Sequence, residues 1–128
     1  QRIAHERLTR ICFIDYDREM ALVAEHADPK TGEKEILGVA RLSRRGGVTE
    51  EAEFAVLIRD AFQRRGLGTL LVGQLLKIGR LEGLRRITAD ILLENYPMQH
   101  ISQKLGFHLH RDTEEIVMKA DLDLYQTA

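Results

Sequence analysis

A glycine-containing loop with two arginines, Gln63-Arg-Arg-Gly-Leu-Gly68, is the segment of this sequence best suited to bind an anion. It lies between a predicted strand and the start of a predicted long helix, where unpartnered backbone N–H groups meet the positive end of the helix dipole. Gly66 and Gly68 allow the backbone to approach phosphate oxygens closely. Arg64 and Arg65 can add positive charge. The pattern therefore predicts a site for a pyrophosphate or a nearby ribose phosphate.

The spacing around this loop excludes two common nucleotide-binding folds. A Rossmann loop needs G-x-G-x-x-G directly after its strand, and a P-loop needs Gly-Lys followed by Ser or Thr. Here Gly66-Leu-Gly68 is followed by Thr69-Leu-Leu-Val-Gly73, without that lysine. The alternative that stays open is a glycine-containing helix start whose arginines are solvated.

Glu53 is the second candidate for chemistry, because it interrupts an apolar strand about ten residues before the loop. An alkyl ammonium, with a pKa of about 10.4, is almost wholly protonated at pH 7, so an enzyme that uses it as a nucleophile needs a base. We expect Glu53 to be partly buried, which favours proton uptake by a carboxylate. The alternative is a strand-end glutamate that points to solvent beside Glu50 and Glu51.

The periodicity of apolar residues predicts a mixed α/β arrangement around these groups. Residues 1–12 are expected to form an amphipathic helix. Leu67–Leu81, with a wide apolar stripe, and Met98–Leu105, between Pro97 and Gly106, are expected to form two more. Strands are expected over Met20–Glu25, Ile36–Leu42, Ala52–Ile58, Arg86–Leu93, Phe107–His110 and Glu115–Ala120, with a turn over Ala27–Lys34.

Composition limits the class of protein. The 128 residues, 44% hydrophobic and 30% charged, suit one hydrophobic core. The formal net charge of −1 comes from interspersed charges, so we expect neither nucleic acid nor membrane as a partner. The single Cys12 cannot build a disulfide framework, which favours a cytoplasmic location. Because the chain opens at Gln1 without a signal-peptide pattern, we interpret it as a domain of a longer protein.

Two motifs resemble those of the GNAT superfamily of N-acetyltransferases. Gln63-x-x-Gly66-x-Gly68 is similar to the family's Q/R-x-x-G-x-G/A loop, and the segment from Asn95 to Phe107 follows the family's spacing. The resemblance covers nearly the whole chain. It implies an α/β fold with a mixed, mostly antiparallel sheet, whose parallel central strands splay at the acetyl-CoA site and which helices flank. It also implies that the fold's first strand is missing.

Within this superfamily, three segments resemble the protein-lysine acetyltransferase domain that is often fused to an ADP-forming acyl-CoA-synthetase-like module: Arg10–Ala24, Ala52–Ala55 and Asn95–Phe107. The resemblance implies acetyl-CoA as cosubstrate and no metal. The β-strand backbone before the loop would pair with the pantetheine amides, as an added strand does. Asn95 would bind the cofactor arm, although a turn-forming Asn before Pro97 explains it equally well. The expected cofactor-binding residues are Val56, Leu57, Ile58, Gln63, Arg64, Arg65, Gly66, Leu67, Gly68, Thr69 and Asn95.

The resemblance also implies that Glu53 is the catalytic base. The family's usual general acid, a tyrosine seven residues after the motif asparagine, is replaced here by Ser102. Because a thiolate with a pKa of about 8.5 is a fair leaving group, the general acid stays open. His108 and His110 alternate on one strand face and could share a metal ion, but without a carboxylate or Cys cluster at ligand spacing we expect surface histidines.

We therefore expect residues 1–128 to form one N-acetyltransferase domain that passes an acetyl group to a primary amine in a ternary complex. The preferred acceptor is a protein lysine, with an acyl-CoA synthetase as candidate acceptor and a fused regulatory module as candidate partner. Two alternatives stay open. One is an enzyme of the same fold that acts on a small amine or polyamine, and the other is a non-catalytic acyl-CoA sensor.

Overall fold

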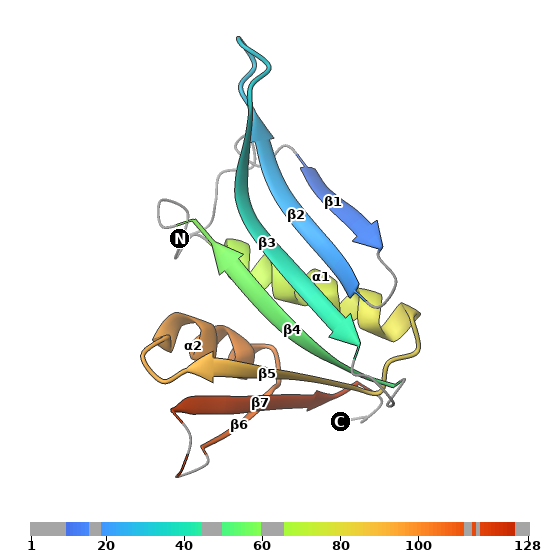
Figure 1. Ribbon diagram of the computed structural model, residues 1–128, viewed down its shortest axis with the longest axis vertical. Coiled ribbons are helices and arrows are strands. Elements are labelled where there is room, and N and C mark those ends of the chain that lie inside the picture. Colours follow the sequence, from blue (N-terminus) through green and yellow to red (C-terminus); the bar gives the residue numbers. More distant parts are fainter. Residues whose placement is uncertain are drawn as a thin grey trace.

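The computed structural model describes residues 10–15, 19–44, 50–59, 66–111, 114 and 116–124. Within them, seven strands form one sheet in the order β1-β2-β3-β4-β5-β7-β6 (Figure 1). All neighbouring strands are antiparallel except β4 and β5, which are parallel. The strands are β1 (Arg10–Asp15), β2 (Glu19–Ala27), β3 (Lys34–Arg44), β4 (Glu51–Ile58), β5 (Arg86–Leu92), β6 (His108–Arg111) and β7 (Val117–Asp123).

The helix α1 (Leu67–Leu81) covers one face of the sheet and runs behind β2, β3 and β4 in Figure 1. Its apolar stripe buries Leu71, Leu75 and neighbouring residues against strand side chains such as Leu42 and Ile87. The helix ends where Gly83 adopts a φ of 79°, a left-handed conformation that glycine accepts without strain. None of the described helices has the length and apolar character needed to cross a membrane.

Burial alternates along β4, and this alternation defines the two faces of the sheet. Ala52 and Phe54 are buried in the core, whereas Glu53, Ala55 and Leu57 are exposed. We call the exposed side, opposite α1, the open face of the sheet. The register of β4 with β5 places Thr88 beside Glu53 on this open face.

The second helix, α2 (Tyr96–Lys104), packs against β6 and the beginning of α1. Phe107, which follows it, is buried and contacts Phe54 edge to face, with ring centroids 5.3 Å apart. This contact fixes the end of α2 against the middle of β4. The helix therefore lies beside the point where β4 and β5 separate.

Most sequence-based elements are confirmed, and the main error lies at the amino-terminal end. The helix expected over residues 1–12 is wrong at Arg10, Ile11 and Cys12, which belong to β1 and pair with β2, while residues 1–9 lie outside the described part. The last strand begins two residues later than expected and continues to Asp123. The expectation that the family's first strand is missing stays a prediction.

Candidate active site

The central strands β4 and β5 form a fork. Their paired register runs from Glu51 opposite Arg86 to Glu53 opposite Thr88 and ends there, although β4 continues to Ile58 and β5 to Leu92. The separation is visible in Figure 1, where the arrowheads of β4 and β5 point apart. Parallel strands that part in this way present peptide groups to a ligand between them. The family resemblance predicts a pantetheine arm, which carries two amides, in this opening.

The beginning of α1 lies at the mouth of the fork. Gly66 is the N-cap residue, with a φ of 85° and no side-chain capping hydrogen bond, and the first helical bond runs from the N–H of Leu70 to the carbonyl of Gly66. The preceding N–H groups therefore have no acceptor within the helix. Unpartnered N–H groups at the positive end of a helix dipole suit phosphate oxygens, and phosphate binding at this turn stays a prediction.

The residues of this turn have different tasks. Leu67 is fully buried, so only its backbone N–H could meet a phosphate, and Thr69 is half-buried. Gly68 is buried, and neighbouring side chains leave little room for a Cβ atom at this position. An added Cβ would lie 2.8 Å from Ile101 Cδ1 and 3.2 Å from Ile58 Cδ1. Gly68 thus allows α1 to pack against α2 and the end of β4. The predicted residues Gln63, Arg64 and Arg65 lie outside the described residues.

Three further predicted cofactor-binding residues lie on the β4 arm of the fork. Val56 and Ile58 pack partly into the core, whereas Leu57 projects onto the open face. Their backbone remains in the ladder with β3. Pairing with β3 therefore fixes the β4 arm of the fork on one side.

Asn95 caps α2. Its Oδ1 accepts a hydrogen bond from the N–H of Met98 at 3.2 Å, and Pro97 occupies the first turn. We predict that Asn95→Ala lowers the free energy of unfolding by about 1 kcal/mol, because the cap is lost. Asn95→Asp keeps an accepting oxygen and should lose much less. Urea unfolding checks this, and an equal loss in both variants would contradict the capping role.

Glu53 lies at the apex of the fork, on the open face. The expectation that it is partly buried is wrong: alternation along β4 turns its side chain away from the core and leaves it exposed. Among the described residues, its carboxylate has no hydrogen-bond or ion-pair partner. It borders a recess that also includes Arg86, Thr88, Ala89, Asp90, His110, Lys119, Ala120 and Asp121.

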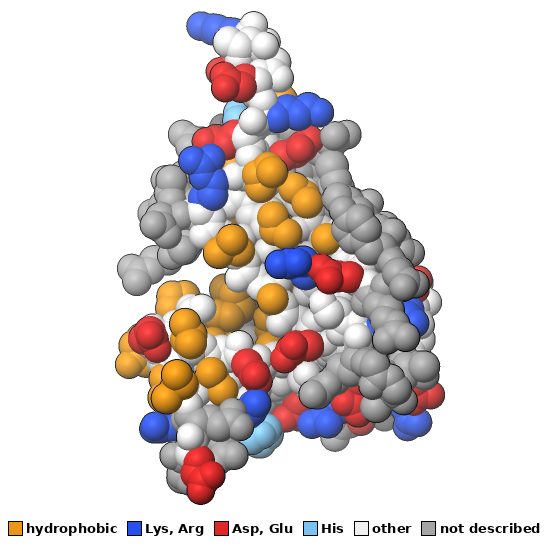
Figure 2. Space-filling model, in the orientation of Figure 1, with side chains coloured by type: hydrophobic (Ala, Val, Ile, Leu, Met, Phe, Trp, Pro, Cys, Tyr) orange, Lys and Arg blue, Asp and Glu red, His pale blue; other side chains and the backbone are white. Residues whose placement is uncertain are grey.

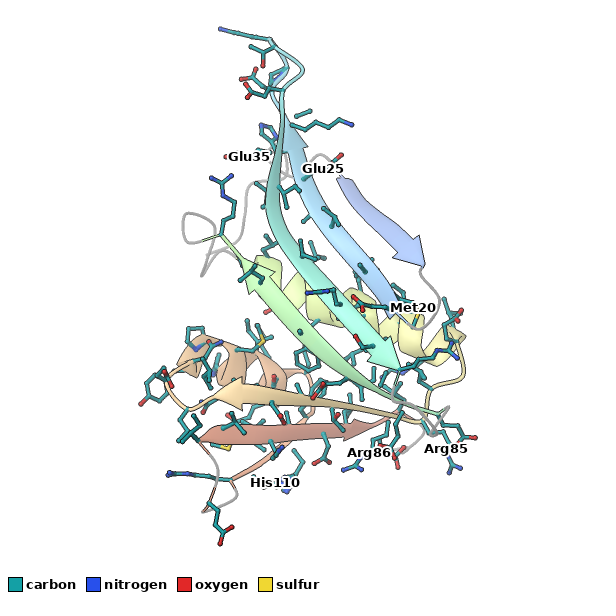
Figure 3. All side chains as sticks on the ribbon, viewed as in Figure 1. Met20, Glu25, Glu35, Arg85, Arg86 and His110 are labelled. Atoms are coloured by element: carbon teal, nitrogen blue, oxygen red, sulfur yellow. The ribbon has the colours of Figure 1, made fainter. Side chains whose placement is uncertain are left out.

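The other charged groups of this recess are paired with one another. Asp90 Oδ1 accepts a hydrogen bond from Lys119 Nζ at 3.0 Å. Asp121 Oδ2 lies 3.8 Å from Arg86 Nη2 and 3.5 Å from His110 Nδ1. Figure 3 shows Arg86 at the start of β5 and His110 on β6, the strands on either side of β7. Glu53 is therefore the carboxylate of the recess that is available to a substrate cation.

Ser102, which replaces the family's tyrosine, does not reach this recess. It is fully buried in α2, and its Oγ has no hydrogen-bond partner among the described residues. A buried hydroxyl without a partner destabilises a fold. We predict that Ser102→Ala raises the free energy of unfolding by about 0.5 to 1 kcal/mol in urea and changes kcat less than twofold. A large loss of kcat would instead indicate that the hydroxyl takes part in the reaction.

His108 and His110 project from β6 and stack with ring centroids 5.6 Å apart. Both are exposed. The residues that the structure describes contain no group of three or more His, Cys, Asp or Glu side chains arranged to hold a metal ion. His110 Nδ1 lies 3.5 Å from Asp121 Oδ2, a carboxylate that sequence spacing alone did not associate with it.

The fork, the uncapped helix start beside it and the carboxylate at its apex are features of an acyltransferase that uses a coenzyme A thioester. The GNAT acetyltransferase domain matches residues 2–108, and the chain belongs to this family. Members of the family bind acetyl-CoA.

Individual relatives agree with this assignment. The chain is 32% identical over 83 residues to acetyltransferase Pat of Mycolicibacterium smegmatis, covering 65% of this chain and 25% of Pat. It is 33% identical over 111 residues to acetyltransferase PA5475 of Pseudomonas aeruginosa, covering 84% of this chain and 56% of that protein. The GNAT domain of S. lividans PAT has a similar structure, with a TM-score of 0.71 and 27% identity over 83% of this chain and 61% of that one. The chain thus spans only part of each relative.

Proposed function

We propose that this protein transfers an acetyl group from acetyl-CoA to a primary amine, preferably the side-chain amine of a lysine in a protein. The observation that carries the proposal is the exposed carboxylate of Glu53 at the apex of the fork, which has no partner among the residues that the structure describes. A carboxylate at this position meets an amine that enters from the open face. The relationship to acetyltransferase Pat supports acetyl transfer. The resemblance of Arg10–Ala24 and Ala52–Ala55 to protein-lysine acetyltransferase domains favours a protein acceptor, and an acyl-CoA synthetase is our first candidate.

The residues of this chain have separate tasks in the proposed reaction. The backbone of β4 beyond Glu53 and the first N–H groups of α1 hold the donor. Acetyl-CoA supplies a thioester, whose C–S bond breaks as the amine nitrogen bonds to the carbonyl carbon. Glu53 accepts the ammonium proton, directly or through water, so that the nitrogen lone pair becomes available. The departing sulfur leaves as a thiolate and takes up the second proton, which the nitrogen loses as the amide forms, because a thiol with an ordinary pKa of about 8.5 is mostly protonated at pH 7.

Mass spectrometry tests the proposal directly. A purified acyl-CoA synthetase is incubated with acetyl-CoA and this protein, and lysine acetylation is compared with an enzyme-free control. Site-specific acetylation above the control is the expected result. If acetyl-CoA binds but neither this acceptor nor other protein lysines are modified, a small-amine enzyme or an acyl-CoA sensor replaces the proposal.

A further inference from the structure

The open face of β5 and β7 continues from the Glu53 recess into an exposed apolar surface. We infer that this surface binds the acceptor protein: the segment with the acceptor lysine lies along these strands and places an aliphatic side chain against Leu92 and Ile116. The inference rests on the proposed function and names the partner of the same site. It concerns the acceptor, which the fork and the helix start do not contact.

The strand register sets out this surface as successive rows. Thr88 pairs with Asp121, Asp90 with Lys119, and Leu92 with Val117. Because each second residue of a strand projects from the same face, Thr88, Asp90 and Leu92 share the open face. The first two rows line the recess beside Glu53, and the third lies just beyond it.

The third row marks the apolar end of the surface, which we define as the pair Leu92 and Val117 together with two exposed residues that adjoin this row in the chain, Tyr96 and Ile116. Leu92 is 51% exposed, Tyr96 72% and Ile116 77%. Ile116 immediately precedes Val117, and Tyr96 follows a turn in which the N–H of Asn95 donates to the carbonyl of Leu92 at 2.9 Å. Figure 2 shows apolar side chains gathered over the end of β5 and the beginning of β7, with carboxylates beside them. Exposed aliphatic groups next to a reactive site favour a ligand that buries them.

The charges along the rows determine how the acceptor lies. Asp90 is paired with Lys119 and Asp121 with Arg86, as described above. Among the described residues of the recess, Glu53 is therefore the carboxylate without a partner, and we expect the lysine ammonium to meet it. The Thr88 row lies level with Glu53. Along β5, the Leu92 row is four residues further on, a distance of about 13 Å. An extended peptide covers this distance in about four residues, and the lysine side chain spans part of it. The aliphatic side chain therefore lies about two to four residues from the lysine.

A small amine or a polyamine would use the Glu53 end alone, since it has no aliphatic branch to place against Leu92. The apolar end thus separates the two classes of acceptor. The test uses two synthetic peptides that differ only in a leucine or a serine three residues after a single lysine, and a second pair with this residue three positions before it. N-acetyl-lysine methylamide serves as the small amine, with acetyl-CoA as donor in every assay.

The informative variants are Leu92→Ser and Ile116→Ser. Both side chains are more than half exposed, so a serine should not unfold the protein. Leu81→Ser is the matched control, because Leu81 is 85% exposed at the end of α1, away from the open face. With the wild-type protein, we expect the leucine peptide of at least one pair to have a kcat/KM about fivefold to tenfold higher than the matching serine peptide. This factor corresponds to the free energy gained when a leucine side chain is partly buried. Leu92→Ser and Ile116→Ser should remove this preference, whereas the control should keep it.

The small amine separates the possible failures. If the wild-type protein acetylates N-acetyl-lysine methylamide and all peptides without a preference for leucine, the inference is overturned and the proposed function stands. The inference is also overturned, and the proposed function still stands, if Leu92→Ser lowers kcat/KM by the same factor for the peptides and for the small amine. If no amine is acetylated although acetyl-CoA binds, the proposed function fails and this inference with it.

Discussion

Replacing Glu53 by glutamine should lower kcat for acetyl transfer by about 10²- to 10⁴-fold at pH 7, the usual contribution of a positioned general base. Binding of acetyl-CoA should not change, because the carboxylate projects onto the open face rather than into the fork. A glutamine keeps the size of the side chain, and Glu53 has no partner among the described residues to lose. Stability should therefore change little. Steady-state kinetics and calorimetric titration with acetyl-CoA measure the two effects separately.

The pH dependence distinguishes a lost base from a displaced substrate. Without Glu53, the reaction must use the small fraction of amine that is already neutral, and this fraction rises about tenfold per pH unit up to a pKa of about 10.4. The deficit of Glu53→Gln should therefore shrink steadily between pH 7 and pH 10. A deficit that stays constant over this range would indicate that Glu53 positions the acceptor instead of taking its proton.

Glu51 provides the matched control for this substitution. It lies on the same face of β4, two residues before Glu53, and its Oε1 is 4.0 Å from Arg86 Nη1. Glu51→Gln removes the same charge but leaves the apex of the fork intact, so kcat should change less than about threefold. Equal losses in both variants would show that the local negative charge matters rather than a particular base.

The elements around the fork could be predicted from sequence because their signals are local. The apolar stripe of α1 and the glycine after it defined both ends of the helix, which the structure places at Leu67 and Leu81. The parallel pairing of β4 and β5 around that helix followed from the family resemblance and is confirmed. The ends of α1 thus need no knowledge of distant contacts, whereas the strand pairing needed the family resemblance.

Features decided by distant partners could not be predicted in this way. Arg10, Ile11 and Cys12 have apolar spacing that also suits a helix, and only pairing with β2 makes the segment a strand. The burial of Glu53 was misjudged for a similar reason: an apolar run suggests a strand covered on both faces, but the described helices α1 and α2 leave the Glu53 face open. The surface that joins Thr88, Leu92 and Ile116 depends on pairing between β5 and β7, which α2 and β6 separate in the sequence.

The acceptor side of the active site is therefore less visible in the sequence than the donor side. Phosphate and amide groups are bound by backbone, so a few glycines and a helix start reveal them. An acceptor is bound by side chains from several strands, whose proximity only the fold determines. The ion pairs Asp90–Lys119 and Asp121–Arg86 illustrate this, because each joins β5 to β7. They leave Glu53 as the available charge without any local signal in the chain.

Gly68→Val should have the largest effect on stability, lowering the free energy of unfolding by about 2 to 3 kcal/mol. Even one added carbon would lie 2.8 Å from Ile101 Cδ1 and 3.2 Å from Ile58 Cδ1. These atoms are the ends of flexible side chains, so alanine should be accommodated at a cost of about 1 kcal/mol. The two further methyl groups of valine leave no such adjustment and push α1 away from α2.

The same substitution should weaken the donor site, because the N–H groups that face the fork belong to the turn that moves. We expect the Kd for acetyl-CoA to rise about fivefold to tenfold, as when about 1 kcal/mol of hydrogen bonding is lost. Gly73→Ala is the control: it lies in the same helix, and nothing lies within 4 Å of its added Cβ. That variant should raise the free energy of unfolding by about 0.5 to 1 kcal/mol, through helix propensity alone, and leave the Kd unchanged. We infer that the close approach of α1 to Ile101 positions the helix start at the fork. A Gly68→Val variant as stable as the wild type would contradict this inference.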